Sequence, residues 1–332
     1  MTVSIPALKH RFEGCLFGLA VGDALGGKFE AQSADAIRAR FPTAESLIAY
    51  PQEEIWYTDD TQMAIGVSVA LIETGEIVED VLCRAFVANY LPSRGYGRGA
   101  RAVLEAMEDG RDYRKVAEQH FPGGSFGNGA AMRVAPIGLV FRDDRQRLWD
   151  QARLSALPTH LHPLGIEGAQ LLALAVALCS QMDKFDRAVF FAELLGACAS
   201  EEYRAKIEAA AAVQAAEDLA GLGNRIEALH SVPTAIASFA LSPESFEATV
   251  SNVIFLGGDT DTLAAMAGAL SGAYMGAGRL PGRLVALLES SPKGRTYLKR
   301  LSEQLFAVYH RGREAQTMLP PGNTLKQPGN PA

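Results

Sequence analysis

Two glycine-striped stretches decide the fold: residues 14–26, GCLFGLAVGDALG, and residues 262–276, TLAAMAGALSGAYMG. In both, glycine recurs every four residues, at Gly14, Gly18, Gly22 and Gly26 and at Gly268, Gly272 and Gly276. Each glycine costs a helix about 1 kcal/mol relative to alanine, so chance in a glycine-rich chain is the weaker explanation. Residues four apart share one helix face, where missing side chains let another backbone approach closely. We therefore predict two helices at the centre of the protein.

The rest of the chain also favours helices. The 332 residues are 48% hydrophobic and rich in alanine, which favours helices over strands. Residues 61–75, 164–182 and 200–221 have helical length and spacing, and strand-like alternation is nearly absent. No linker or composition break divides the chain. We predict an all-α fold with one domain over residues 1–317 and a loosely ordered tail over residues 318–332.

Composition also limits the partners. The net charge of −7, from 38 acidic and 31 basic residues, and the absence of a long basic run argue against nucleic-acid binding. The N-terminus has no apolar signal core, and the longest apolar stretch, residues 262–276, is short for a bilayer. Four widely spaced cysteines indicate a reducing compartment rather than a disulfide or zinc framework. We expect a cytoplasmic monomer that does not bind membranes.

Two acidic motifs open predicted helices: residues 57–61, YTDDT, and residues 257–262, GGDTDT. Helix capping explains one acid at each helix start, because Asp and Thr are preferred N-caps. Capping does not explain two acids, since neighbouring carboxylates repel unless a cation or a proton intervenes. If the motifs converge, their four carboxylates and two hydroxyls suit a pair of hard divalent cations about 3.5–4 Å apart.

A glutamate, two glycine-rich loops and a histidine are further candidates. Glu30 follows the first glycine stretch and could point into a cavity, although a solvated surface acid is the plainer interpretation. Asp23, inside that stretch, is more consistent with a buried structural hydrogen bond. Residues 123–129, GGSFGNG, and residues 94–99, RGYGRG, could bind an anion such as phosphate or be plain turns. His160 is either a buried hydrogen-bonding residue or a ligand contact.

Six segments together resemble the ADP-ribosylglycohydrolase family, over about residues 11–310. They are GCLFGLAVGDALGGKFE (14–30), YTDDTQMA (57–64), GYGRGA (95–100), GGSFGNGAAMRVAPIGLVF (123–141), THLHPLGIEGA (159–169) and LGGDTDTLAAMAGALSGAYMG (256–276). Within the family, the glycine loop, the histidine segment and NRIEALHSVPTAI (224–236) resemble the ADP-ribosylhydrolase 3 branch. The other main branch contains the dinitrogenase reductase-activating glycohydrolases and the arginine-specific hydrolases.

The resemblance implies an orthogonal bundle of many helices around a centre of two Mg²⁺ or Mn²⁺ ions. By motif match, the implied metal ligands are Glu30, Thr58, Asp59, Asp60, Asp259, Asp261 and Thr262. Glu30 and Asp60 are the implied catalytic acids. The implied substrate-binding residues are Asp59, Gly97, Gly99, Gly123, Gly124, Ser125, Phe126, Gly127, Asn128, Gly129, His160 and Ile226. In this set residues 125–129 would hold the diphosphate, and Phe126, which stands where the family has tyrosine, would flank the adenosine with His160.

The implied function is a metal-dependent ADP-ribosylhydrolase that cleaves the glycosidic bond at the distal ribose. The implied substrates are ADP-ribosylated proteins with serine linkages favoured, poly(ADP-ribose) and O-acetyl-ADP-ribose. An arginine-specific hydrolase is the alternative, and a non-catalytic ADP-ribose binder should have lost the acids that stand here. A two-metal phosphohydrolase would need phosphate rather than ribose to face the metals. Cleavage would pass through an oxocarbenium-like state, with Glu30 as general acid or base.

Overall fold

The two glycine-striped stretches form α1 (Ile5–Gly26) and α15 (Thr260–Met275), which run antiparallel with their backbones in contact. A methyl group built on Gly18 would lie closer than 3.0 Å to the carbonyl oxygen of Gly268, and the other crossings are equally tight. Real side chains do not approach backbone that closely, so these crossings require glycine. The prediction of two central helices is confirmed, and each glycine face is explained by its contact with the other helix.

The structure is a computed structural model that describes residues 4–318, and within them it contains α-helices, short 3-10 helices and no β-strand. The α-helices are α1 and α15 with the bounds above, α2 (Ala34–Arg40), α3 (Ala44–Ala49), α4 (Asp59–Thr74), α5 (Glu79–Asn89), α6 (Arg98–Glu108), α7 (Tyr113–His120), α8 (Ala135–Val140), α9 (Arg145–Ala156), α10 (Pro163–Gln181), α11 (Arg187–Leu195), α12 (Glu201–Ala212), α13 (Ala228–Leu241), α14 (Phe246–Ile254), α16 (Gly282–Leu287) and α17 (Arg295–Met318). The 3-10 helices are η1 (Pro92–Arg94), η2 (Asn128–Ala130), η3 (Ala216–Gly221) and η4 (Ala277–Arg279).

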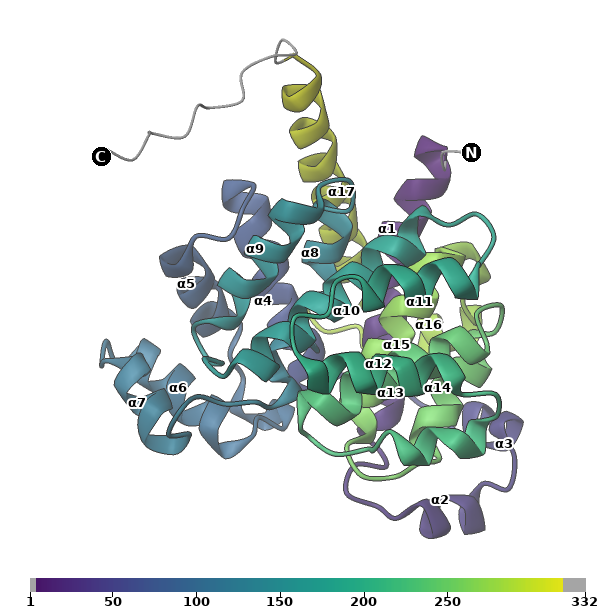
Figure 1. Ribbon diagram of the computed structural model, residues 1–332. Helices are drawn as coiled ribbons and strands as arrows, with labels where there is room; N and C mark the ends of the chain where they lie inside the picture. Colours follow the sequence, from purple (N-terminus) through teal and green to yellow (C-terminus); the bar gives the residue numbers. More distant parts are fainter. Residues whose placement is uncertain (1–3, 319–332) are drawn as a thin grey trace.

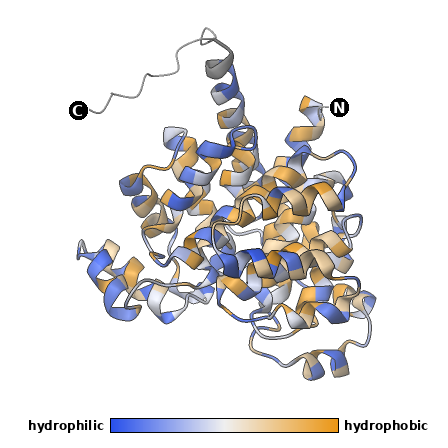
Figure 2. Cartoon of the chain, viewed as in Figure 1, coloured by the Kyte–Doolittle hydropathy of each residue, from blue (hydrophilic) through white to orange (hydrophobic). Residues whose placement is uncertain are grey.

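The other helices surround the α1–α15 pair (Figure 1). Helices α10, α13 and α14 pack on α15, and α4, α8 and α17 pack on α1. Helices α5, α6 and α7 follow one another outward from α4. All of α15 except Met275 is buried, so no polar face is available to make it amphipathic. Figure 2 shows hydrophobic residues gathered on the central helices and hydrophilic residues on α7 and the outer turns of α17.

Three sequence-based helix predictions can be compared with the structure. Helices α4 and α10 match the predicted segments 61–75 and 164–182 within two residues. The predicted segment 200–221 is interrupted, because α12 ends and the 3-10 helix η3 follows after a short break. The carboxylate of Asp218 stabilises this break by accepting the backbone N–H of Ala215 at 2.9 Å. This contact between turn residues competes with helix continuation and leaves no trace in the hydrophobic spacing.

Helix α10 is the longest strongly apolar helix in the described part of the chain, and it exceeds the apolar stretch 262–276 singled out from the sequence. By length and composition alone it could cross a membrane. Its most apolar window is 78% buried inside the protein, which is typical of a core helix. The predicted domain boundary after residue 317 falls at the end of α17, and the rest of the predicted tail, residues 319–332, lies outside the described residues.

Candidate functional site

The YTDDT motif lies at the start of α4, where Thr58 is the N-cap and Asp59 and Asp60 occupy the first turn. Thr58 does not cap its own helix with its side chain. The carboxylate of Asp23 takes this role from α1, accepting the backbone N–H groups of Thr58 at 2.8 Å and Thr61 at 3.0 Å. It also accepts both threonine hydroxyls, at 2.7 and 2.5 Å. The structural hydrogen-bonding role predicted for Asp23 is confirmed, and it fixes the start of α4 on α1.

The GGDTDT motif turns sharply into the start of α15. Gly257 and Gly258 have φ values of +67° and +77°, a region that favours glycine. A methyl group on Gly257 would also lie closer than 3.0 Å to the carbonyl oxygen of Gln32. Within the first turn, the Thr260 hydroxyl donates a hydrogen bond to the carbonyl oxygen of Gly26 at 2.8 Å. The two acidic motifs therefore converge, because both are attached to the last turns of α1.

The turn after α1 brings Glu30 to the same place. Ala31 has a φ of +62°, which costs an L-residue other than glycine roughly 1 kcal/mol. Hydrogen bonds to the GGDTDT motif hold this conformation: Ala31 N–H donates to the Gly258 carbonyl at 2.8 Å, and Gly258 N–H donates to the Gln32 carbonyl at 3.0 Å. Backbone strain of this kind is frequent where a functional side chain must be aimed. The turn is thereby joined to the second acidic motif.

The acids form a cluster that fits a divalent cation. Glu30, Asp259 and Asp261 each place a carboxylate oxygen within 4.8 Å of the others. Asp60 is 1% exposed, and among the described residues nothing donates a hydrogen bond to its buried Oδ1. An unpartnered buried carboxylate oxygen is costly, which indicates that another group satisfies it. Carboxylate and hydroxyl oxygens are the ligands that Mg²⁺ and Mn²⁺ prefer.

The electrostatics of the cluster support the same interpretation. Burial raises the pKa of Asp23 to about 7, although its threonine hydrogen bonds oppose the shift. Burial, reinforced by the charge of Asp259, likewise raises the pKa of Asp261 to about 7. For Asp59 and Asp60, burial together with the charges of Asp23 and Asp261 raises the pKa well above the ordinary carboxyl range. A bound cation would stabilise the charged forms of these acids and reverse the shifts.

A cavity of about 390 Å³ opens beside the acids. Its acidic wall is formed by Glu30, Asp59, Asp259, Asp261 and Thr262. The predicted substrate-binding residues that line it are Gly97, Gly99, Ser125, Gly127, Asn128, Gly129, His160 and Ile226. The Asn128 amide joins the two walls, donating hydrogen bonds to Asp259 Oδ2 at 2.5 Å and Ser231 Oγ at 3.1 Å. The structure thus brings most of the predicted site residues to one cavity.

Five predicted residues lie outside the cavity wall. Thr58 and Asp60 are placed behind the acids, where the Thr58 hydroxyl lies 3.0 Å from Asp60 Oδ2. Gly123 and Gly124 form the turn before the loop, with φ values of +82° and +92°. Phe126 is 49% exposed and packs its ring edge-to-face on His162, with 5.5 Å between ring centroids. The structure therefore does not place the Phe126 ring on the wall where adenosine contact was expected.

Sequence reasoning missed Phe121 and Met132, which also line the cavity, as does Arg98 of the predicted RGYGRG loop. The Phe121 ring is 40% exposed and lies against α6 so closely that a methyl group on Gly99 would come within 3.0 Å of it. A flat apolar surface of this kind suits an aromatic ligand ring. The available signal was an aromatic residue directly before the PGG turn at residues 122–124.

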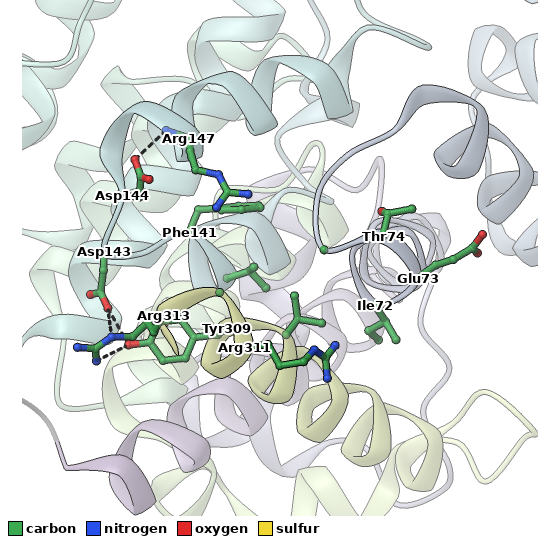
Figure 3. A pocket seen from close by; sticks show the side chains of 14 residues that line it. Ile72, Glu73, Thr74, Phe141, Asp143, Asp144, Arg147, Tyr309, Arg311 and Arg313 are labelled. Atoms are coloured by element: carbon green, nitrogen blue, oxygen red, sulfur yellow. Dashed lines mark hydrogen bonds and ion pairs between the residues drawn. The ribbon is translucent and has the colours of Figure 1, made fainter. Parts of the chain in front are cut away.

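A second cavity, of about 350 Å³, lies between α4, α9 and α17 and contains none of the predicted site residues (Figure 3). Figure 3 shows Asp143, Tyr309 and Arg313 pointing toward one another. The Tyr309 hydroxyl donates to Asp143 Oδ2 at 2.7 Å, and Arg313 donates to the Tyr309 oxygen at 3.1 Å. The polar side chains of this group satisfy one another. The converging acids therefore distinguish the first cavity as the candidate active site.

Comparisons with known proteins agree with the motifs. The ADP-ribosylglycohydrolase family model matches residues 4–315. ADP-ribosylhydrolase ARH3 of Homo sapiens is 35% identical, over 82% of this chain and 87% of the human protein. An uncharacterized protein of Archaeoglobus fulgidus is 30% identical, over 92% and 98% of the two chains. A solved ADP-ribosylglycohydrolase-related protein complex shares the fold, with a TM-score of 0.69 at 24% identity, covering 92% of this chain and 99% of that chain. This chain therefore belongs to the ADP-ribosylglycohydrolase family and is a hydrolase of glycosidic bonds.

Proposed function

We propose that this glycosidase is a metal-dependent ADP-ribosylhydrolase that releases ADP-ribose from modified proteins, with serine-linked ADP-ribose as the favoured substrate. One observation carries the proposal: the carboxylates of Glu30, Asp259 and Asp261 converge at the wall of a glycine-lined cavity. Two ions, Mg²⁺ or Mn²⁺, are the proposed cofactors. The substrate class is supported by the human relative, which is named an ADP-ribosylhydrolase.

The cavity wall has the chemistry that ADP-ribose needs. Backbone N–H groups in glycine-rich loops, here Gly97 to Gly99 and Gly127 to Gly129, suit the oxygens of a diphosphate. Phe121 supplies an apolar surface for the adenine ring. The negative charge of the acidic wall would repel a diphosphate unless cations were bound there. Binding of ADP-ribose at the glycine-rich loops would therefore depend on cations at the acidic wall.

The proposed reaction breaks the bond between the anomeric carbon of the distal ribose and the side-chain oxygen of the modified residue. Bound divalent cations would supply fixed positive charge that holds the ribose hydroxyls. The carboxylates stabilise the positive charge that develops on the sugar. Burial, together with the charge of Asp261, raises the pKa of Glu30 above that of an ordinary glutamate, which is the direction that a general acid needs. Glu30 can then protonate the leaving oxygen or, after losing that proton, activate water.

Hydrolysis assays test the proposal. Full-length protein with Mg²⁺ should release ADP-ribose from a serine-ADP-ribosylated peptide. Glu30→Gln should retain ADP-ribose binding but lose at least about 100-fold in kcat, because a proton-transferring group is removed. The matched control is Glu53→Gln, an exposed glutamate outside the cavity, which should leave kcat unchanged.

Each failure of the assay has a distinct meaning. Release from an arginine-linked peptide alone would replace the serine preference with the arginine-specific alternative. Release of inorganic phosphate instead of ADP-ribose would indicate a phosphohydrolase. Binding of ADP-ribose without any release would indicate a non-catalytic binder. The monomeric state and the cytoplasmic location stay predictions, which light scattering and cell fractionation would check.

A further inference from the structure

A buried arginine without an ion pair stands behind the wall of the candidate active site. Arg133 is 1% exposed, and in the described part of the chain its hydrogen-bond partners are a carbonyl and a hydroxyl rather than a carboxylate. Its guanidinium lies 4.7 Å from the centroid of the Phe86 ring, and its Nε has no hydrogen-bond partner among the described residues. Burial lowers the pKa of Arg133 to about 9. Burying a cation without a neighbouring carboxylate costs folding free energy. The hydrogen bonds that Arg133 does make therefore indicate what the residue is for.

Those hydrogen bonds fix the orientation of a hydroxyl group. Arg133 Nη2 donates to the Ser155 carbonyl at 2.7 Å and to the Thr159 hydroxyl oxygen at 2.8 Å. A guanidinium can only donate, so the threonine hydroxyl accepts from Arg133 and keeps its own proton for a second partner. Nδ1 of His160 lies 2.7 Å from this hydroxyl, whereas the Ala156 carbonyl lies 3.5 Å away. Because the shorter distance gives the stronger hydrogen bond, the Thr159 hydroxyl donates its proton to His160 Nδ1.

An imidazole whose Nδ1 accepts a hydrogen bond carries its proton on Nε2 when it is neutral. Burial and the charge of Arg133 lower the pKa of His160 to about 3, so the ring is neutral at physiological pH. Among the described residues, no protein group accepts a hydrogen bond from His160 Nε2. His160 lines the cavity beside the glycine loop, where its Nε2 lies 3.3 Å from a methyl group built on Gly129. The free N–H is therefore available at the cavity wall.

We infer that Arg133 and Thr159 are positioning residues that hold His160 as a neutral Nε2–H donor to an acceptor atom of the bound nucleotide. The inference rests on the proposed function, because it takes ADP-ribose as the nucleotide. It gives the buried charge a role, because Arg133 occupies an acceptor position of the Thr159 hydroxyl and leaves its proton free for His160 Nδ1. It also makes His160 selective: a ligand atom that can only donate would leave the Nε2–H unsatisfied.

The tautomer of His160 provides a direct test that needs no ligand. Full-length protein labelled with ¹⁵N-histidine should show His160 with a bare Nδ1 and a protonated Nε2. Thr159→Val removes the hydroxyl but keeps the branched shape, so His160 should become a mixture of tautomers. Thr159→Ser keeps the hydroxyl and should restore the single tautomer. A protonated Nδ1 in the wild-type protein, or equal spectra for the Val and Ser variants, would overturn the inference.

Binding of ADP-ribose by calorimetry tests the consequence for the ligand. Thr159→Val should weaken binding about tenfold, the effect of one lost hydrogen bond, and Thr159→Ser should restore it. In the hydrolysis assay the Val variant should raise KM and change kcat less than about twofold, because the chemistry occurs at the acids. Equal affinities for both variants would refute the inferred contact. Wild-type protein that binds no ADP-ribose would contradict the proposed function instead, while the tautomer spectra would still decide whether Thr159 orients His160.

Discussion

Glycine serves two different purposes in two regions of this protein. Between α1 and α15, the space beside each helical glycine is filled by the backbone of the other helix, as at Gly18 and Gly268. At Gly97, in the cavity wall, a methyl group would meet no protein atom within 4 Å. The first kind of glycine is required by the protein's own packing, and the second leaves room for something else. Substitutions should therefore separate the two regions, with effects on folding in one and on ligand binding in the other.

The largest effect is expected at the helix crossing. Gly18→Ala would place a methyl group within 3.0 Å of the Gly268 carbonyl, and backbone cannot move aside as a side-chain end can. We expect the free energy of unfolding to fall by about 3 kcal/mol or more, or the folded protein to be lost. Gly312→Ala is the matched control, since it lies in α17 with no atom within 4 Å of the added methyl. Urea unfolding followed by circular dichroism should show this control unchanged or up to about 1 kcal/mol more stable. Equal stabilities would remove the packing explanation.

At the junction of the two regions, Asp261→Asn should separate metal binding from folding. Removal of one carboxylate from the cluster should weaken Mn²⁺ binding at least about 100-fold and abolish hydrolysis. The folded state should persist, because asparagine also removes a buried charge. Calorimetric titration with Mn²⁺ measures the first effect and thermal unfolding the second. Asp109→Asn, at an exposed position in an ion pair with Arg111, is the control. Unchanged affinity for Mn²⁺ in the Asp261 variant would show that this carboxylate is not a ligand.

The acid cluster also predicts how the stability of protein kept in chelator depends on pH. The pKa of Asp23 and of Asp261 is about 7 in the folded protein, against an ordinary value of 3.8. Between these values the folded state binds more protons than the unfolded state, so stability must fall as pH rises from about 4 to about 7. We expect a loss of several kcal/mol, roughly 4 kcal/mol for each of the two carboxyls, measured by urea unfolding across this range. The loss should shrink in Asp261→Asn and in the presence of Mg²⁺. Two results would contradict a buried, uncompensated cluster. One is a wild-type stability that does not fall between about pH 4 and about pH 7, and the other is an equal fall in the wild-type protein and in Asp261→Asn.

The smallest effect on stability is expected in the cavity wall. Gly97→Ala has an ordinary backbone conformation and meets no neighbour, so the free energy of unfolding should change by less than about 0.5 kcal/mol. The methyl group would nevertheless stand in the space proposed for the diphosphate, and ADP-ribose should bind about tenfold more weakly. Calorimetry with ADP-ribose measures this change. A variant that binds normally would place the ligand elsewhere in the cavity.

The sequence predicted the parts of the structure that follow from repetition or from residue chemistry. Glycine spacing predicted the central helices, and the paired acids predicted a converging acidic site. Contacts between distant segments left no local pattern. The exposed position of Phe126 depends on its packing against His162, and Phe121 reaches the cavity because Gly99 leaves room for its ring. The buried Arg133 lies in an apolar segment whose spacing gives no indication of its polar partners.

The anchoring of both acidic motifs to α1 has a consequence for how the protein can vary. Asp23 holds the YTDDT motif and the Gly26 carbonyl holds the GGDTDT motif. Both halves of the site are therefore positioned by one helix, α1. The path of the chain between residues 60 and 259 therefore has little influence on the distance between the motifs, apart from the contacts that Asn128 and Asn224 make with Asp259. Surface loops in it can therefore lengthen, shorten or change sequence while the catalytic geometry stays constant. Such changes can alter the substrate preference while the positions of the acidic residues stay the same.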